Sequence, residues 1–318
     1  MIFTRRVLAA LPLAGPVLAQ GFPSQPIRLV TPYPPGGGTD TVARMLLPHL
    51  VAQLGQTIIV ENRGGAGGAI GAGEVARAAG NGHTLLLDAM GHVVNPSLMP
   101  NLPFDYATAF TPITQLTLQP QMLVVPQASP FATLGALIEA ARARPGVFNF
   151  ASSGNGTGAH LAMVALSRAA GIEVVHVPYR GGGPAMTDLL AGNVSMAFAS
   201  VAAASAHVQS GRLRALGAAG PREIPALPGM RPIAEQGFPG FDWDEWNGLW
   251  TTAGAPRGAV ARLHAATVFA LAQPDVRARM AGIGIVPLGT GEADFAAFVA
   301  AQRERAAQLI RAANITLG

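Results

Sequence analysis

Residues 27–40 read IRLVTPYPPGGGTD and indicate the fold class of this chain. Ile27–Val30 has the short apolar pattern of a buried strand. After the glycine-rich loop Pro34–Asp40, apolar residues recur at helical spacing up to Gly55, a typical helix stop. A strand that leads through a glycine loop into a helix is typical of the first unit of an α/β fold.

The same alternation continues along the first ninety residues or so. Thr57–Val60 and Thr84–Leu87 are expected strands, Arg63–Gly68 is a second glycine loop, and Ile70–Ala79 is an expected helix. Strands that alternate with helices predict a parallel sheet with right-handed crossovers.

The pattern restarts after about residue 120. The segment 112–120 has no strong core period, so the residues after it are expected to form a second α/β unit. This unit has the following expected strands and helices: strands 122–125, 148–151, 174–177, 194–199 and 213–218, and helices 134–143, 158–169 and 185–191.

The last hundred residues are expected to return to the first unit. A connection rich in Pro and Gly at 222–240 precedes an expected strand at 249–252 and helices at 260–272 and 295–313. Two chain crossings between lobes predict a hinged cleft. The expected division is 1–20 signal peptide, 21–120 first part of lobe one, 121–222 lobe two, and 223–318 the connection and second part of lobe one.

Composition excludes several kinds of chemistry. The chain has 318 residues, no Cys and no Lys, so all 21 basic residues are Arg. This excludes a P-loop lysine, a Schiff base, a cysteine nucleophile, an iron–sulfur cluster and a disulfide. The net charge is only +4, and no basic cluster contains interleaved aromatic residues. We therefore expect no nucleic-acid partner.

The N-terminus predicts export. Arg5 and Arg6 precede the apolar stretch Val7–Leu18, and a cut after Ala19 would fit a secretory signal peptide. The Arg pair also has a weak twin-arginine pattern, so the export route stays open. The alternative is a membrane anchor, but the segment is short for a bilayer span. The expected location is the periplasm.

Two glycine loops are candidate anion sites. Gly36–Gly38 lets backbone N–H groups converge at a helix N-terminus, which suits a carboxylate. Thr39 and Asp40 either join this site or cap the helix. Residues 151–160 have the same position in the second unit, where they are either a mere tight turn or the partner loop for a dicarboxylate. The candidate contact residues of that loop are Ser152, Ser153, Asn155, Thr157 and His160, the last being either a ligand contact or an ordinary helix residue.

A third candidate lies at the end of the strand at 174–177. Tyr179 and Arg180 stand where ligands of α/β sheets usually bind. Arg180 is either a bidentate partner of a carboxylate or a surface charge. Asp188 on the next helix either accepts a ligand hydroxyl or amine or orients a loop.

Signals for enzymes and metals are weak. Gly71–Ala76 matches a loose dinucleotide pattern, but it begins inside a helical segment. No Gly-x-Ser-x-Gly elbow occurs, and the seven His show no metal-ligand spacing. We therefore predict no catalytic residue, cofactor or metal. The aromatic run Phe241–Trp250 either packs in the core and hinge or forms a stacking platform.

As an ordered set, the motifs closely resemble the Bug receptors, the extracytoplasmic solute receptors of tripartite tricarboxylate transporters. The resemblance runs from about Phe22 to the C-terminus. Its best signatures are PIRLV at 26–30, the loop 36–40, LGQ at 54–56 with VENR at 60–63, GHTLL at 82–86, FTPI at 110–113, the loop 152–160, HVPY at 176–179, TDLL at 187–190 and PR at 256–257.

This resemblance implies an α/β fold, namely a two-lobed periplasmic-binding-protein type II fold with a ligand cleft between the lobes. It also implies that backbone groups and bridging waters hold the ligand carboxylate. The positions carried over are Tyr33, Gly37, Gly38, Thr39, Ala89 to His92, Ser152, Ser153, Thr157, His160, Tyr179 and Asp188. The chain departs from the family where Arg180 replaces a frequent Lys and where an Ala-rich run follows Ser200.

The expected function is capture of a small organic carboxylate, by a monomer, for delivery to the membrane permease subunits of such a transporter. The alternatives are a secreted α/β hydrolase and a sensor that passes a signal to a membrane partner. Citrate-like, amino-acid and aromatic carboxylates all offer the same anionic group. Selectivity is expected opposite the first loop, around Ser152–His160, Tyr179–Arg180 and the stretch after Ser200.

Overall fold

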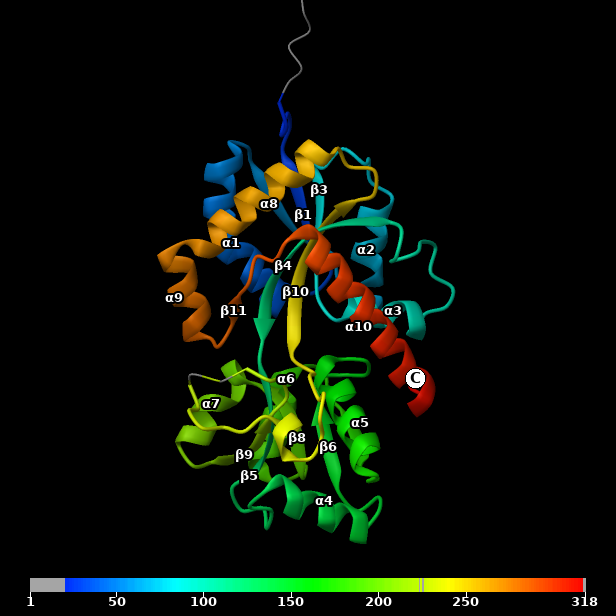
Figure 1. Cartoon of the computed structure of the whole chain (residues 1–318), viewed down its shortest axis with the longest axis vertical. Helices are drawn as coiled ribbons and strands as arrows, with labels where there is room; N and C mark the ends of the chain where they lie inside the picture. Colours follow the sequence, from blue (N-terminus) through cyan, green and yellow to red (C-terminus); the bar gives the residue numbers. More distant parts are fainter. Residues whose placement is uncertain (1–20, 223, 225, 317–318) are drawn as a thin grey trace, which may run out of the picture.

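The computed structural model describes residues 21–222, 224 and 226–316, and the expected signal peptide lies outside this part. Figure 1 shows two lobes, with the long strands β4 (Phe110–Gln119) and β10 (Glu245–Thr252) running side by side from the upper lobe toward the lower. The chain therefore passes between the lobes along this strand pair.

The first lobe is built on a six-stranded sheet in the order β11-β4-β10-β3-β1-β2. Its other strands are β1 (Ile27–Thr31), β2 (Ile58–Asn62), β3 (Thr84–Asp88) and β11 (Val286–Pro287). One face packs on α1 (Gly38–Leu54), α8 (Arg257–Ala272) and α9 (Pro274–Gly282). The other face packs on α2 (Ala69–Ala76), α3 (Gly91–Leu98) and α10 (Glu292–Ala313), and a short 3-10 turn, η1 (Ala66–Gly68), leads into α2.

Burial on both faces explains why these strands are almost continuously apolar. Successive side chains of a strand point to opposite faces. In β3, Leu85 and Leu87 join the core under α1 and α8, whereas Leu86 joins the core under α10. Gly55 ends α1 in the left-handed conformation, with φ of 69°, as the sequence predicts.

The second lobe has a five-stranded sheet in the order β7-β6-β8-β5-β9. The strands are β5 (Gln121–Pro126), β6 (Asn149–Ser152), β7 (Val175–Pro178), β8 (Met196–Ser200) and β9 (Leu213–Ala218). The helices are α4 (Leu134–Ala143), α5 (Gly158–Ala170), α6 (Gly182–Ala191) and α7 (Val201–Gln209), and the returning connection contains the 3-10 turn η2 (Ile233–Gln236). The residue limits expected for the two lobes stay a prediction.

The prediction of a parallel sheet is confirmed for the three strands on which it was based, but each complete sheet also contains antiparallel strands. β1, β2 and β3 pair in parallel, as do β6, β7 and β8. However, β10 runs antiparallel to β3 and β4, and β5 runs antiparallel to β8 and β9. Because β10 and β5 enter their sheets directly from the other lobe, no helical crossover sets their direction.

No strand was predicted for residues 112–120, because they show no strong core period. They lie largely in β4, whose residues Ile113–Thr117 are all buried. β4 is covered on both faces and contains Thr and Gln, so it shows no alternation of apolar and polar residues. Thr114 Oγ1 donates to the carbonyl of Thr290 at 2.8 Å, which satisfies one of these buried polar groups. Helices α3, α7 and α9 were not expected either.

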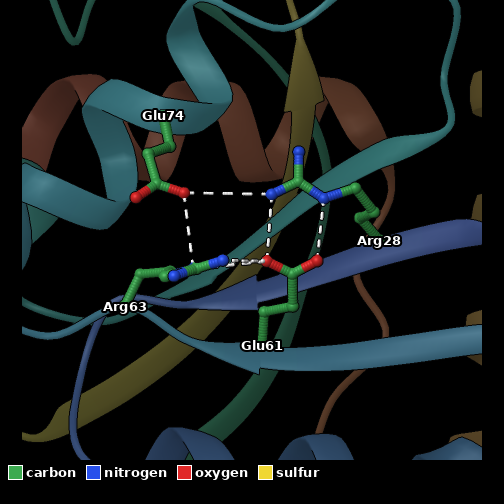
Figure 2. Close-up of polar contacts among 4 residues, drawn as sticks. All are labelled: Arg28, Glu61, Arg63 and Glu74. Atoms are coloured by element: carbon green, nitrogen blue, oxygen red, sulfur yellow. Dashed lines mark hydrogen bonds and ion pairs between the residues drawn. The ribbon is translucent and has the colours of Figure 1, made fainter.

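A cluster of four charged residues supports the glycine loop that follows β2 (Figure 2). Glu61 accepts from Arg28 Nε at 2.8 Å and from Arg63 Nη2 at 3.1 Å. Glu74 Oε2 lies 3.5 Å from Arg63 Nε and 3.8 Å from Arg28 Nη2. The bond from Arg28, followed by that from Arg63, lowers the pKa of Glu61 to about 2. This cluster ties β1, β2 and α2 together on the edge of the first lobe.

In the described part of the chain, no helix combines the length and apolar character needed to span a bilayer.

Candidate ligand-binding site

A cleft of about 680 Å³ lies between the lobes. Its walls are the N-terminal ends of α1, α3, α5 and α6 and the crossing strands β4 and β10. Ten residues predicted from sequence line it: Tyr33, Gly37, Gly38, Thr39, Ala89, Ser152, Ser153, Asn155, Thr157 and Ser200. Six others stand outside its lining: Asp40, His92, His160, Tyr179, Arg180 and Asp188.

The first glycine loop presents free donors to the cleft. Gly37 is the N-cap of α1 and makes no side-chain capping bond. The first backbone N–H groups of a helix have no acceptor inside it, and the N-terminus has a partial positive charge. Thr39 is 4% exposed, and its Oγ1 has no hydrogen-bond partner in the structure. A buried unpaired hydroxyl costs free energy, so this arrangement suits a ligand oxygen.

Asp40 supports this loop from behind. Its carboxylate accepts from Gly36 N at 2.9 Å, from Arg44 Nε at 2.9 Å and from Asn62 Nδ2 at 3.1 Å. The bond from Arg44 is the main cause that lowers the pKa of Asp40, and burial opposes it. The carboxylate therefore stays ionised and holds the loop. The helix-capping alternative is wrong for Asp40, because the N-cap of α1 is Gly37 and has no side-chain cap.

Tyr33 and His92 differ in their relation to the cleft. Tyr33 lines the cleft, its hydroxyl donates to Asp88 Oδ1 at 3.1 Å, and burial raises the pKa of Tyr33 well above the usual range. His92 is 1% exposed and stacks on Trp250 with ring centroids 4.0 Å apart. Burial lowers the pKa of His92. His92 is therefore a core residue on the buried side of α3.

The second glycine loop is fixed by its own hydrogen bonds. Ser152 Oγ donates to Gly154 O at 3.0 Å and lies 2.6 Å from His176 Nε2. Gly156 N donates to His160 Nδ1 at 3.1 Å. The two His rings stack with centroids 3.9 Å apart, and burial, followed by the His176 charge, lowers the pKa of His160 to about 4. His160 therefore holds the loop in its neutral form.

In the third candidate loop, Tyr179 and Arg180 do not line the cleft. The Tyr179 hydroxyl donates to Asp188 Oδ2 at 2.6 Å, so these two residues bind each other. Arg180 is exposed, in line with its alternative as a surface charge. Gly181 and Gly182 line the cleft in their place. Ser200 lines the cleft and also caps α7, accepting from Ala203 N at 3.3 Å.

Five polar residues on the floor of the cleft were not predicted from the sequence. They are Asn95, Gln119, Gln121, Glu245 and Asn247. The aromatic residues of the run 241–250, by contrast, are buried and none lines the cleft, so they pack in the core rather than forming a stacking platform. In β10, polar residues at 245 and 247 alternate with Trp at 246. That period of two was the available signal.

Glu245 gives the cleft its electrostatic character. Its Oε1 accepts from Gly158 N, the first residue of α5, at 3.1 Å. Burial raises the pKa of Glu245, and the bond from Gly158 opposes this shift. Among the described residues that line the cleft, Glu245 is the one charged side chain.

Across the described chain, no group of three or more His, Asp or Glu is placed to hold a metal ion.

Residues 42–315 match the model of the tripartite tricarboxylate transporter family receptor. The chain belongs to this family. It is similar to a protein encoded in the tcbD-tcbE intergenic region of Pseudomonas sp. strain P51, with 40% identity over 96% of this chain and 93% of the relative. Protein BugT of Bordetella pertussis is 33% identical over 96% and 94% of the two chains.

Solved structures of similar proteins confirm the two-lobed receptor fold. MatC of Rhodopseudomonas palustris with bound malate is 31% identical, with a TM-score of 0.77 over 91% of this receptor and 100% of MatC. Another R. palustris protein, with adipate, is 29% identical, with a TM-score of 0.80 over 93% and 99% of the two chains. The resemblance to Bug receptors is therefore confirmed, and this tripartite tricarboxylate transporter receptor is a solute-binding protein.

Proposed function

We propose that this receptor binds a small organic carboxylate in its cleft and delivers it to the membrane permease subunits of a tripartite tricarboxylate-type transporter. The observation that carries the proposal is the N-terminus of α1, where the buried Thr39 Oγ1 has no partner and Gly37 makes no side-chain cap. A carboxylate oxygen supplies the acceptor that both features lack. Malate and adipate in the two R. palustris structures support the same ligand class.

We propose binding without catalysis. The nearest approach to a nucleophile–base pair is Ser152 with His176. Ser152 is 1% exposed, and its Oγ bonds with both the carbonyl and the N–H of Gly154. A nucleophile must reach substrate, whereas this hydroxyl is fixed inside its own loop. We therefore infer that Ser152 and His176 hold the second glycine loop in place and do not act as the nucleophile and base of a hydrolase.

The expected site of action is the periplasm, as a monomer. The predicted signal peptide supports export, and a family structure, that of BugD, is of a periplasmic binding protein. One chain supplies both lobes and the whole described cleft, which supports action as a single chain. Delivery to a permease rather than to a signalling partner rests on membership of the transporter family.

Thermal unfolding with a broad panel of mono-, di- and tricarboxylates tests this function. A ligand that binds only the folded state and is present at about 100 times its Kd adds about 2.7 kcal/mol to the free energy of unfolding. Calorimetry then measures the Kd of each acid that raises Tm. The proposal fails if no acid raises Tm and native mass spectrometry of the purified protein detects no bound acid.

A further inference from the structure

Among the helix N-termini that face the cleft, those of α1 and α5 are not equivalent. The N-terminus of α1 has free donors and the unpaired Thr39 hydroxyl. The N-terminus of α5 already holds an acceptor, because Gly158 N donates to Glu245 Oε1. A side-chain carboxylate of the protein thus occupies the position that a ligand carboxylate would take on the second lobe.

The strand pair β4–β10 brings these two helix ends to one place. Gln119 and Glu245 are direct partners in the antiparallel register, so their side chains lie on the same face. A Cβ at Gly38, on α1, would lie 3.7 Å from the Gln119 side-chain amide. A Cβ at Gly158, on α5, would lie 2.5 Å from Glu245 Oε1. A ligand on α1 therefore extends toward the Glu245 carboxylate.

The charge balance of the cleft disfavours a second negative group. The described lining residues include no Arg or His to offset Glu245. The N–H of Gly158 and the positive end of α5 offset part of the cost of burying the Glu245 carboxylate, and the absence of a Cβ at position 158 makes this close contact possible. A dicarboxylate would place its second charge against this carboxylate, whereas a cationic nitrogen would pair with it.

We propose that Glu245 determines specificity, and that the receptor prefers a monocarboxylate with a protonated amine: the carboxylate binds at the N-terminus of α1 and the ammonium group pairs with Glu245. This inference rests on the proposed function, since it presupposes that a carboxylate binds on α1. It narrows the ligand class from organic acids in general to zwitterionic amino acids with one carboxylate.

Calorimetry with matched ligand pairs tests the inference. In each pair an ammonium group replaces a carboxylate: glycine with malonate, β-alanine with succinate, γ-aminobutyrate with glutarate, δ-aminovalerate with adipate, and phenylalanine with benzylmalonate. The wild-type receptor is expected to bind the amino member of its best pair at least about tenfold more tightly. Glu245→Gln is expected to lose this preference, through weaker binding of the amino acid and tighter binding of the diacid.

Glu139→Gln is the matched control, because Glu139 is exposed on α4 and does not line the cleft. Its ligand preference should equal that of the wild type. Tighter binding of the diacid by the wild-type protein overturns the inference but leaves the proposed function intact. An unchanged preference in a folded Glu245→Gln variant also overturns it. No binding by any of these paired compounds overturns this inference, whereas the proposed function fails only if the broad carboxylate panel and native mass spectrometry also detect no bound acid.

Discussion

At the scale of single residues, Thr39 and Asp40 have different roles, although the sequence offered the same two alternatives for both. Asp40 binds Gly36, Arg44 and Asn62 and holds the loop from behind. Thr39 is buried on the cleft side with an unpaired hydroxyl. Neighbouring residues of a helix point in directions about 100° apart, so Asp40 can hold the loop while Thr39 lines the cleft.

Thr39→Val tests this assignment. The substitution keeps the shape of the side chain and removes the unpaired oxygen, so the free energy of unfolding should stay equal or rise. The Kd for the tightest acid of the panel should rise about tenfold, because a hydrogen bond to a charged group is lost. Calorimetry and thermal unfolding measure the two effects.

Thr41→Val is the control on the same helix, since Thr41 does not line the cleft. Its affinity should match the wild type. If Thr39→Val binds as tightly as the wild type, the hydroxyl does not contact the ligand.

At the scale of elements, sequence patterns predicted those segments whose limits are marked by local signals. α4 and β9 match their expected limits, and α1 ends at the expected Gly55. β4 was not predicted because its buried Thr and Gln side chains form hydrogen bonds with residues that are distant in the sequence. Thr117, for example, donates to Asn247, which lies 130 residues later. A single segment cannot reveal a partner so distant in sequence.

In the candidate site, too, local sequence patterns revealed some residues but not those that depend on distant partners. The glycine loops were visible because glycine next to a helix start is a local signal. Glu245 and Gln119 were not, because they matter only through their pairing across β4 and β10. Tyr179 and Asp188 were predicted near the ligand, but the structure pairs them with each other. Whether each lining residue contacts the ligand stays a prediction.

Gly38→Ala and Gly158→Ala compare the two helix starts, since each glycine is the first residue of its helix. A Cβ at Gly38 makes an ordinary 3.7 Å contact, so stability should hardly change. A Cβ at Gly158 would displace Glu245 from its donor and leave a buried carboxylate without that bond. We expect Gly158→Ala to lower the free energy of unfolding by about 1–3 kcal/mol. Urea unfolding measures the difference. If both variants have the same free energy of unfolding, the bond between Gly158 N and Glu245 does not stabilise the fold.

At the scale of the whole molecule, the two segments that join the lobes are bonded to each other. Asp244 Oδ1 accepts from Gln121 N at 2.9 Å, and Gln121 Nε2 donates to the carbonyl of Trp243 at 3.1 Å. Both contacts lie where β4 passes into β5 and where the chain returns to β10. Any opening of the cleft bends the chain here, so these bonds form the expected hinge.

The carboxyl of Asp244 makes this hinge sensitive to pH. Asp244 is 6% exposed, and burial raises its pKa to about 7, above the ordinary 3.8. Between these values the folded protein holds a proton that the unfolded chain releases, so the free energy of unfolding falls as pH rises. Above about pH 7 the full cost of a buried charge is present, on the order of 2–4 kcal/mol.

Asp244→Asn keeps an acceptor for Gln121 N and cannot ionise. The variant should therefore match the wild type near about pH 4 and exceed its free energy of unfolding by about 2–4 kcal/mol near about pH 8.5. Urea unfolding at several pH values measures this difference, with the exposed Asp294→Asn as the control for loss of a surface carboxylate. A stability difference that does not grow with pH would contradict the assignment, because only a carboxyl that is neutral at low pH and charged at high pH produces that slope at the hinge.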